Sequence, residues 1–103
     1  MKLFTIDTIP GQAFEALNTV KGTVVYSKNF GRDFMAGMKT LVGGEIAGYT
    51  EMLNEARQIA TKRMVDAAGA LGADAVVGLR YASSFVMLGA AEVIAYGTAV
   101  KFC

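Results

Sequence analysis

The sequence predicts a single α+β domain with a mainly antiparallel sheet, in the order strand, strand, helix, helix, strand, strand. The chain has 103 residues, the size of one domain. Segments with the alternating polarity of strands lie at both ends, and segments with a helical period lie between them. Strands therefore do not alternate with helices as they do around a parallel sheet, and this grouping favours the α+β class.

The first two strands are expected near the N-terminus. Residues 2–8 alternate as a short strand would, and Pro10–Gly11 ends it. Residues 12–17 fit one helical turn. Residues 19–28 are rich in β-branched side chains and form the second strand. Gly22 lies inside this strand, which indicates a bulge or the close approach of another backbone.

Two helices follow, a short one over about residues 32–42 and a long one over residues 49–71. The long segment keeps an apolar period of 3.6 over about six turns. Ile59 and Met64 belong to its apolar stripe, so both are expected to be buried. Gly72 stands where a glycine commonly ends a helix.

Two more strands, residues 75–85 and 92–102, complete the sheet. The last strand is apolar or small on both faces. One face carries Ile94, Tyr96, Val100 and Phe102, and the other carries Val93, Ala95, Gly97 and Ala99. A strand of this kind is usually covered on both sides. The helices can cover one face of the sheet, and a second subunit is expected on the other.

The composition also predicts self-association. Hydrophobic residues make up 53% of the chain and charged residues only 18%, which leaves an apolar surplus for so small a domain. No membrane partner is expected, because the longest uncharged stretch, residues 81–91, falls short of the roughly 20 residues of a spanning helix. Asp7 comes too early for a signal peptide. We therefore expect a homo-oligomer that buries the surplus between its subunits.

The charge and the cysteine content limit the classes of partner and the cellular location that we expect. The net charge is +1, and the basic residues form no run longer than two, whereas nucleic-acid binders show a basic stripe. No nucleic-acid partner is therefore expected. A single cysteine, Cys103, excludes a disulfide framework within the chain and favours the cytoplasm.

Short segments along nearly the whole chain match the pattern of a known protein family. They are Gly22–Val25, Arg32–Asp33, Gly43–Gly44, Tyr49, Ala56–Arg57, Leu71–Val77 and Gly97–Val100. In this order they resemble the YbjQ-like family of small bacterial and archaeal proteins. The resemblance implies a small α+β fold, a pentameric ring and no established activity, under the frequent label "putative heavy-metal-binding domain". Glu45–Ile46 departs from many relatives, which look basic and polar there, and this argues against an anion site at that turn.

The chain has few of the side chains that bind heavy metals. Soft metals prefer thiolate and imidazole, but the chain has no histidine and only Cys103 as a thiol. One subunit therefore cannot build an ordinary zinc or copper site, and no cofactor is expected. The alternative is a ring of Cys103 side chains around an oligomer axis.

The candidate ligand-binding residues are Arg32, Asp33, Tyr49 and Arg57. Arg32–Asp33 stands at the start of the short helix, where it either holds an anion or forms a cap with an intersubunit ion pair. Arg57 lies beside the apolar stripe of the long helix. It either reaches into a pocket or pairs with Glu51 or Glu92. Tyr49 belongs to the core, an interface or the ligand site.

The absence of histidine also argues against an enzyme. No nucleophile and base stand at a recognisable spacing, so no catalytic residue is proposed. The leading hypothesis is a non-catalytic, ring-forming module that binds a small ligand or a partner between subunits. Two alternatives stay open: an oligomer that binds or sequesters metal, and an enzyme of unknown type.

Overall fold

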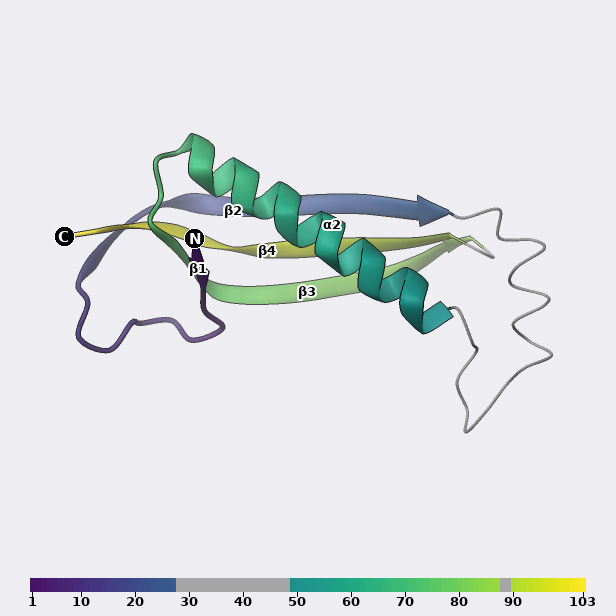
Figure 1. The fold of residues 1–103 in the computed structure, drawn as a ribbon, viewed down its shortest axis with the longest axis horizontal. Helices are drawn as coiled ribbons and strands as arrows, with labels where there is room; N and C mark the ends of the chain where they lie inside the picture. The colour runs from purple at the N-terminus through teal and green to yellow at the C-terminus, as the bar shows by residue number, and fades with distance from the viewer. Residues whose placement is uncertain (28–48, 88–89) are drawn as a thin grey trace.

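The computed structural model describes residues 1–27, 49–87 and 90–103, and these form a four-stranded sheet with one helix (Figure 1). The elements are β1 (Lys2–Leu3), β2 (Phe14–Ser27), α2 (Tyr49–Ala70), β3 (Ala75–Met87) and β4 (Ala90–Phe102). The α+β class is confirmed. The short helix expected over residues 32–42 lies outside the described residues.

The sheet is mixed, with the strand order β1-β3-β4-β2. β4 is antiparallel to both β2 and β3, whereas β1 runs parallel to β3. The predicted antiparallel character therefore holds for the three long strands only. Both long pairings centre on β4, which is the strand that the sequence marks as apolar on both faces.

The N-terminal segment differs from the prediction in two places. β1 covers only Lys2–Leu3 of the expected strand over residues 2–8, although Phe4 and Ile6 continue its backbone hydrogen bonding to β3, where their partners are Val76, Gly78 and Leu79. The helical turn expected over residues 12–17 is wrong, because β2 already begins at Phe14. Phe14 pairs with Phe102, so a contact distant in sequence overrides the local preference.

The long helix matches its prediction closely. α2 begins at Tyr49 and ends at Ala70, one residue before the expected end. Gly72 has φ +77°, and its N–H donates to the carbonyl of Gly69 at 3.0 Å while the N–H of Ala73 donates to Ala68 at 3.1 Å. These two bonds form a Schellman motif, which satisfies carbonyl groups left free at a helix end.

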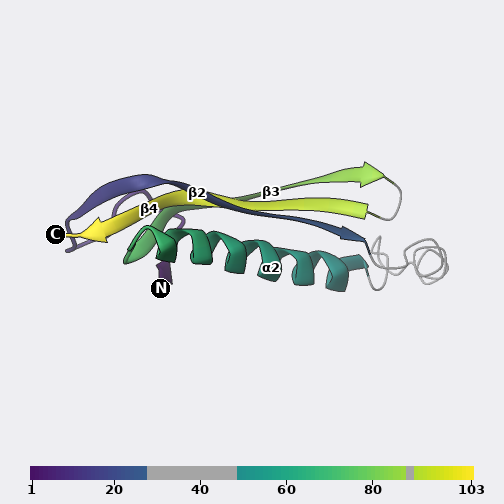
Figure 2. The same ribbon diagram turned by 90° about the horizontal axis from the view of Figure 1, so that it is seen from above.

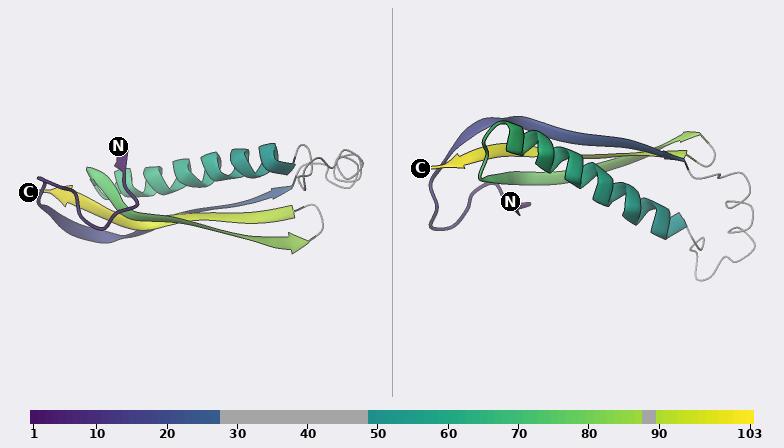
Figure 3. Two further views of the ribbon diagram at one scale, coloured as in Figure 1. Left: turned by 90° about the horizontal axis from the view of Figure 1, so that it is seen from below. Right: turned by 45° about the horizontal axis from the view of Figure 1, so that its top comes forward.

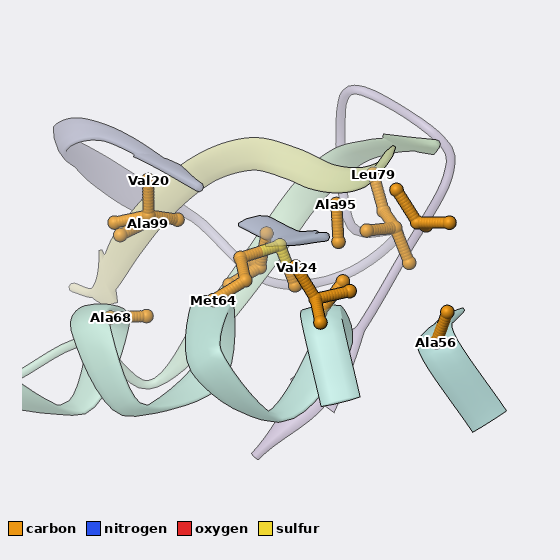
Figure 4. Packing of buried hydrophobic residues seen from close by; sticks show 11 residues of the cluster. Val20, Val24, Ala56, Met64, Ala68, Leu79, Ala95 and Ala99 are labelled. Atoms are coloured by element: carbon orange, nitrogen blue, oxygen red, sulfur yellow. The ribbon is translucent and has the colours of Figure 1, made fainter. Parts of the chain in front are cut away.

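α2 packs on one face of the sheet, here called the helix face (Figure 2). The buried residues beneath it are mostly small. Figure 4 shows this cluster, which includes Val20, Val24, Ala56, Met64, Ala68, Leu79, Ala95 and Ala99. Met64 is fully buried as predicted, whereas Ile59 is half-buried at the edge of the cluster. Small side chains on both layers bring the helix close to the strands.

A bulge in β3 interrupts the alternation of its two faces. Strict alternation places Val77 and Leu79 together, but Gly78 and Leu79 both lie opposite Gly97, and Gly78 has φ +63°. The extra residue turns Leu79 back to the helix face beside Val76, while Val77 lies on the other side. The side chains of residues 80–84 follow this shift.

The opposite side of the sheet, here called the outer face, is covered at one end only. Phe4, Ile9 and Phe14 pack there against a second small cluster of Ala75, Val77 and Val100. Toward the far ends of the strands, no described element lies over the outer face (Figure 3). Val25, near the end of β2, is 56% exposed on this face, and Tyr96, in the middle of β4, is 45% exposed.

Within residues 1–27, 49–87 and 90–103, no helix has the length and apolarity to cross a membrane.

Candidate functional site

A groove opens between α2 and β3 and is here called the α2–β3 groove. It holds about 220 Å³. Its lining residues are Leu53, Arg57, Tyr81, Ser83 and Val93. A wider and more open groove of about 700 Å³ adjoins it and shares Arg57 and Tyr81, so these two side chains stand at the boundary of both spaces. The remaining residues of the wider groove are Asn54, Gln58, Thr61, Lys62 and Val65.

The arrangement of the two layers creates this groove. α2 crosses the sheet diagonally, from the β3 side at its first residues to the β2 side at its last (Figure 1). Leu53 and Arg57 are one turn apart on the helix and share its β3 flank. Tyr81 and Ser83 are two residues apart on β3 and share the helix face, where Ser83 lies opposite Val93.

A short chain of hydrogen bonds fixes the hydroxyl of Tyr81. Thr61 Oγ1 lies 2.6 Å from the carbonyl oxygen of Arg57 and 2.8 Å from the hydroxyl oxygen of Tyr81. A threonine hydroxyl has one proton, which it donates to the carbonyl, a group that can only accept. Tyr81 therefore donates its proton to Thr61, and the Tyr81 oxygen has only lone pairs left for a ligand.

Arg57 is exposed, and its guanidinium donates to Asn54 Oδ1. It forms no ion pair with a carboxylate of the described residues. Within the described residues it therefore forms neither the pair with Glu51 nor the pair with Glu92 that the sequence left open. Glu92 lies in register with Val25 on the outer face, so the sheet separates it from Arg57.

The other cation of the wider groove is already paired. Lys62 Nζ lies 3.0 Å from Asp66 Oδ2, one turn along the helix, and both side chains are well exposed. The α2–β3 groove and the wider groove beside it have no carboxylate among their lining residues. Arg57 is therefore the uncompensated charge of the α2–β3 groove as far as the structure describes it.

The sequence-predicted site residues do not all come together. Arg32 and Asp33 lie outside the described residues. Tyr49 begins α2, but its side chain is likewise outside the description. Of the four ligand-binding candidates, Arg57 alone is placed in a described groove. Cys103 lies at the opposite end of β4, exposed, with its N–H donating to the carbonyl of Ala13 at 3.1 Å.

The described side chains do not fit a soft metal within one chain. No cluster of three or more His, Cys, Asp and Glu residues occurs in residues 1–27, 49–87 and 90–103. The whole sequence lacks imidazole, and Cys103 is its only thiol. A site of ordinary zinc or copper composition therefore requires ligands from several subunits.

Sequence reasoning missed the strand half of the groove. Tyr81 and Ser83 were placed on β3 with no functional role, and Thr61 was not singled out. Their orientation depends on the bulge at Gly78, which rotates the residues that follow it and which the sequence alone does not indicate. In the structure Tyr81 is 45% exposed on the helix face, where it lines the α2–β3 groove.

Known proteins similar to this chain were found by sequence and by structure. The sequence model of a family described as "Putative heavy-metal-binding" matches residues 1–103. A UPF0145 protein of Clostridium novyi is 59% identical over 101 residues, which cover 98% of each chain. A UPF0145 protein of Thermotoga maritima is 59% identical over 102 residues, which cover 98% of this chain and 96% of that protein.

One solved structure supports the fold. A crystal structure from Pediococcus pentosaceus, described as a protein with unknown function of the DUF74 family, superposes with a TM-score of 0.74. The superposition covers 100% of this chain and 98% of the other at 19% sequence identity. At this identity the likeness concerns the fold alone.

Proposed function

This chain belongs to the YbjQ family, and from that premise we propose that it is a non-catalytic, ring-forming homo-oligomer that binds a small ligand in the α2–β3 groove. The relatives compared above carry names that state no activity. The proposal therefore rests on the groove itself and on the surfaces that the described residues leave exposed.

The observation that carries the proposal is Arg57 at the mouth of a partly apolar groove, with no carboxylate partner in the described structure. Ligand sites typically combine an apolar lining with a few fixed polar groups. Leu53 and Val93 supply the apolar part, and Arg57, Tyr81 and Ser83 supply the polar groups. Asn54 and Thr61 hold two of these polar groups in place through hydrogen bonds.

The proposal of binding without catalysis is supported by the chemistry of the groove. Its lining residues offer no imidazole, carboxylate or thiol to transfer a proton near neutral pH. Tyr81 is engaged by Thr61. The single cysteine supports a cytoplasmic location as part of the same proposal.

Assembly is supported by the outer face of the sheet. Val25 and Tyr96 leave large apolar side chains exposed there, beside Ile94, in a chain with only 18% charged residues. Apolar surface of this kind commonly marks a contact between proteins. We propose that a second copy of the chain covers it. The number five comes from the family resemblance.

The groove is tested by filling it. Ser83→Leu adds an apolar side chain inside the groove, and Ser84→Leu makes the same change on the outer face, because adjacent strand residues point to opposite sides. Both variants and the native protein are melted against a library of small anions, cations and neutral compounds. We expect compounds that raise the melting temperature of the native protein and of Ser84→Leu but not of Ser83→Leu. A library in which no compound distinguishes the two variants would contradict the proposal.

A further inference from the structure

We infer that the ligand of the α2–β3 groove is a small organic anion, with a carboxylate or phosphate group bound by Arg57 and an apolar body packed against Leu53 and Val93. The inference rests on the proposed function, since it names the class of ligand for the same groove. It is carried by the geometry of Arg57, by the size of the groove and by the hydrogen-bond direction at Tyr81.

Arg57 is prepared to bind an anion. Its guanidinium has five N–H donors, of which Asn54 Oδ1 accepts from one nitrogen, Nη2. The remaining donors keep the planar arrangement that matches the two oxygens of a carboxylate or phosphate. The Asn54 contact comes from the same helix, one turn away, so it orients the guanidinium without neutralising its charge.

The neighbouring arginine shows the contrast. Arg63 follows Arg57 on the same helix, but its Nη1 donates to the backbone carbonyl of Thr23 at 2.7 Å, on the β2 side. Arg63 thus covers a carbonyl of an edge strand, whereas Arg57 faces the groove. The two residues carry equal charge on one helix in different surroundings, which makes Arg63 a matched control.

The volume of the α2–β3 groove limits the size of the part of the ligand that lies inside it. At about 220 Å³, the α2–β3 groove is smaller than the roughly 300–1,000 Å³ of sites that take drug-sized molecules. It suits a body about the size of one ring or a short alkyl chain. Leu53 and Val93 line it with aliphatic carbon, so an anion with no apolar part leaves this surface unused.

Tyr81 determines where the anionic group lies. Its proton is donated to Thr61, so its oxygen presents lone pairs and repels a second anionic oxygen. The charged end of the ligand therefore lies against Arg57 and away from the Tyr81 oxygen. Replacing Tyr81 by Phe is consequently expected to change anion affinity by less than about threefold, a small effect beside that of Arg57.

Benzoate, benzamide and inorganic phosphate are suitable probes. Benzoate and benzamide have the same shape and differ in charge, and phosphate has the charge without the apolar body. Each is titrated into the native full-length protein, Arg57→Gln and Arg63→Gln, with binding followed by amide chemical shifts in NMR. A hydrogen bond to a charged group contributes roughly 1.5–3 kcal/mol, about 10- to 150-fold in affinity. We therefore expect benzoate to bind Arg57→Gln at least tenfold more weakly than it binds the native protein.

The controls make the result specific. We expect Arg63→Gln to stay within about twofold of the native protein, because that side chain lies on the other flank of α2. Benzamide and phosphate are each expected to bind the native protein at least tenfold more weakly than benzoate does. The inference would be overturned if benzamide or phosphate bound as tightly as benzoate, or if Arg57→Gln bound benzoate as tightly as the native protein does. It would also be overturned if benzoate showed no saturable binding. If neutral compounds still distinguish Ser83→Leu from Ser84→Leu, the ligand class is wrong and the proposed function stands.

Discussion

At the scale of single residues, the packing of α2 depends on Gly22. A Cβ atom at this position would overlap the carbonyl oxygen of Ala60 and the backbone nitrogen of Met64. Both atoms belong to the helix backbone, which cannot move aside as a flexible side chain can. The close backbone approach that a glycine inside a strand suggests is therefore present, and it sets the distance between the two layers.

Gly22→Ala is expected to lower the free energy of unfolding by about 3 kcal/mol or more, because the added methyl group pushes on backbone atoms. Gly69→Ala makes the same chemical change inside α2, where nothing lies within 4 Å of the new atom. It is expected to stabilise the protein by about 0.5–1 kcal/mol. Urea denaturation of both variants checks the opposite signs. Equal effects would mean that the helix does not rest on Gly22.

The heavy-metal-binding description of the family can be tested at Cys103. Its thiol is exposed and stands apart from other metal-binding side chains of the described residues. We expect Cys103→Ser to keep the free energy of unfolding within about 0.5 kcal/mol of the native value, as at an uninvolved surface position. Thermal melting with and without zinc is the measurement. A rise in melting temperature with zinc that needs Cys103 would instead show a metal site shared between subunits.

At the scale of elements, much of the structure follows from periodicity. The 3.6-residue period and Gly72 predict α2 almost to the residue, because both signals are local to the helix. The start of β2 at Phe14 was not predictable, since it depends on pairing with Phe102 at the other end of the chain. The bulge at Gly78 similarly depends on Gly97 across the sheet.

The candidate site likewise combines a residue that the sequence predicts with residues that only the fold identifies. Arg57 was predictable from its place beside the apolar stripe of the helix. Tyr81 and Ser83 were not, because the bulge decides which way they face and only the fold brings β3 beside α2. The sequence therefore supplies the charge of the site, and the tertiary structure supplies the strand that faces it.

The buried face of α2 predicts unequal effects along the helix. Met64 is fully buried, so Met64→Ala is expected to cost about 2–5 kcal/mol of stability through the cavity that it leaves. Ile59 is half-buried, and Ile59→Ala is expected to cost less than about 2 kcal/mol. Chemical denaturation separates the two. If Ile59→Ala lost more stability than Met64→Ala, assembly would have to bury the Ile59 flank of the helix further.

At the scale of the whole molecule, the outer face raises the question of assembly. The N-terminal segment covers one end of this face with Phe4, Ile9 and Phe14. Beyond this end, Tyr96 in the middle of β4 and Val25 near the end of β2 remain exposed. In the described chain α2 therefore covers one face of the sheet, whereas the other face is covered at one end only, and a second copy covers the rest in our proposal.

Light scattering of the native protein at micromolar concentration is expected to give the mass of a homo-oligomer. Tyr96→Lys places a charge on the outer face and is expected to lower that mass, because an unpaired charge is costly to bury. Leu71→Lys is the matched control, since Leu71 is 46% exposed and Tyr96 is 45% exposed. We expect Leu71→Lys to assemble normally. A native protein with the mass of a monomer, or equal masses for both variants, would argue against assembly through this face.

The register between β2 and β4 has a consequence for folding. The β3–β4 pair is local, but β2 must find β4 across most of the chain, with Phe14 beside Phe102 at one end and Ser27 beside Ala90 at the other. Closing so long a loop is entropically costly before any contact forms. Chains dominated by such distant pairings fold in milliseconds to seconds, so we expect the β4 edge that binds β2 to stay bare until this distant pairing forms. In that interval β4 can pair with the β2 of another copy, and the distant pairing thereby favours domain swapping.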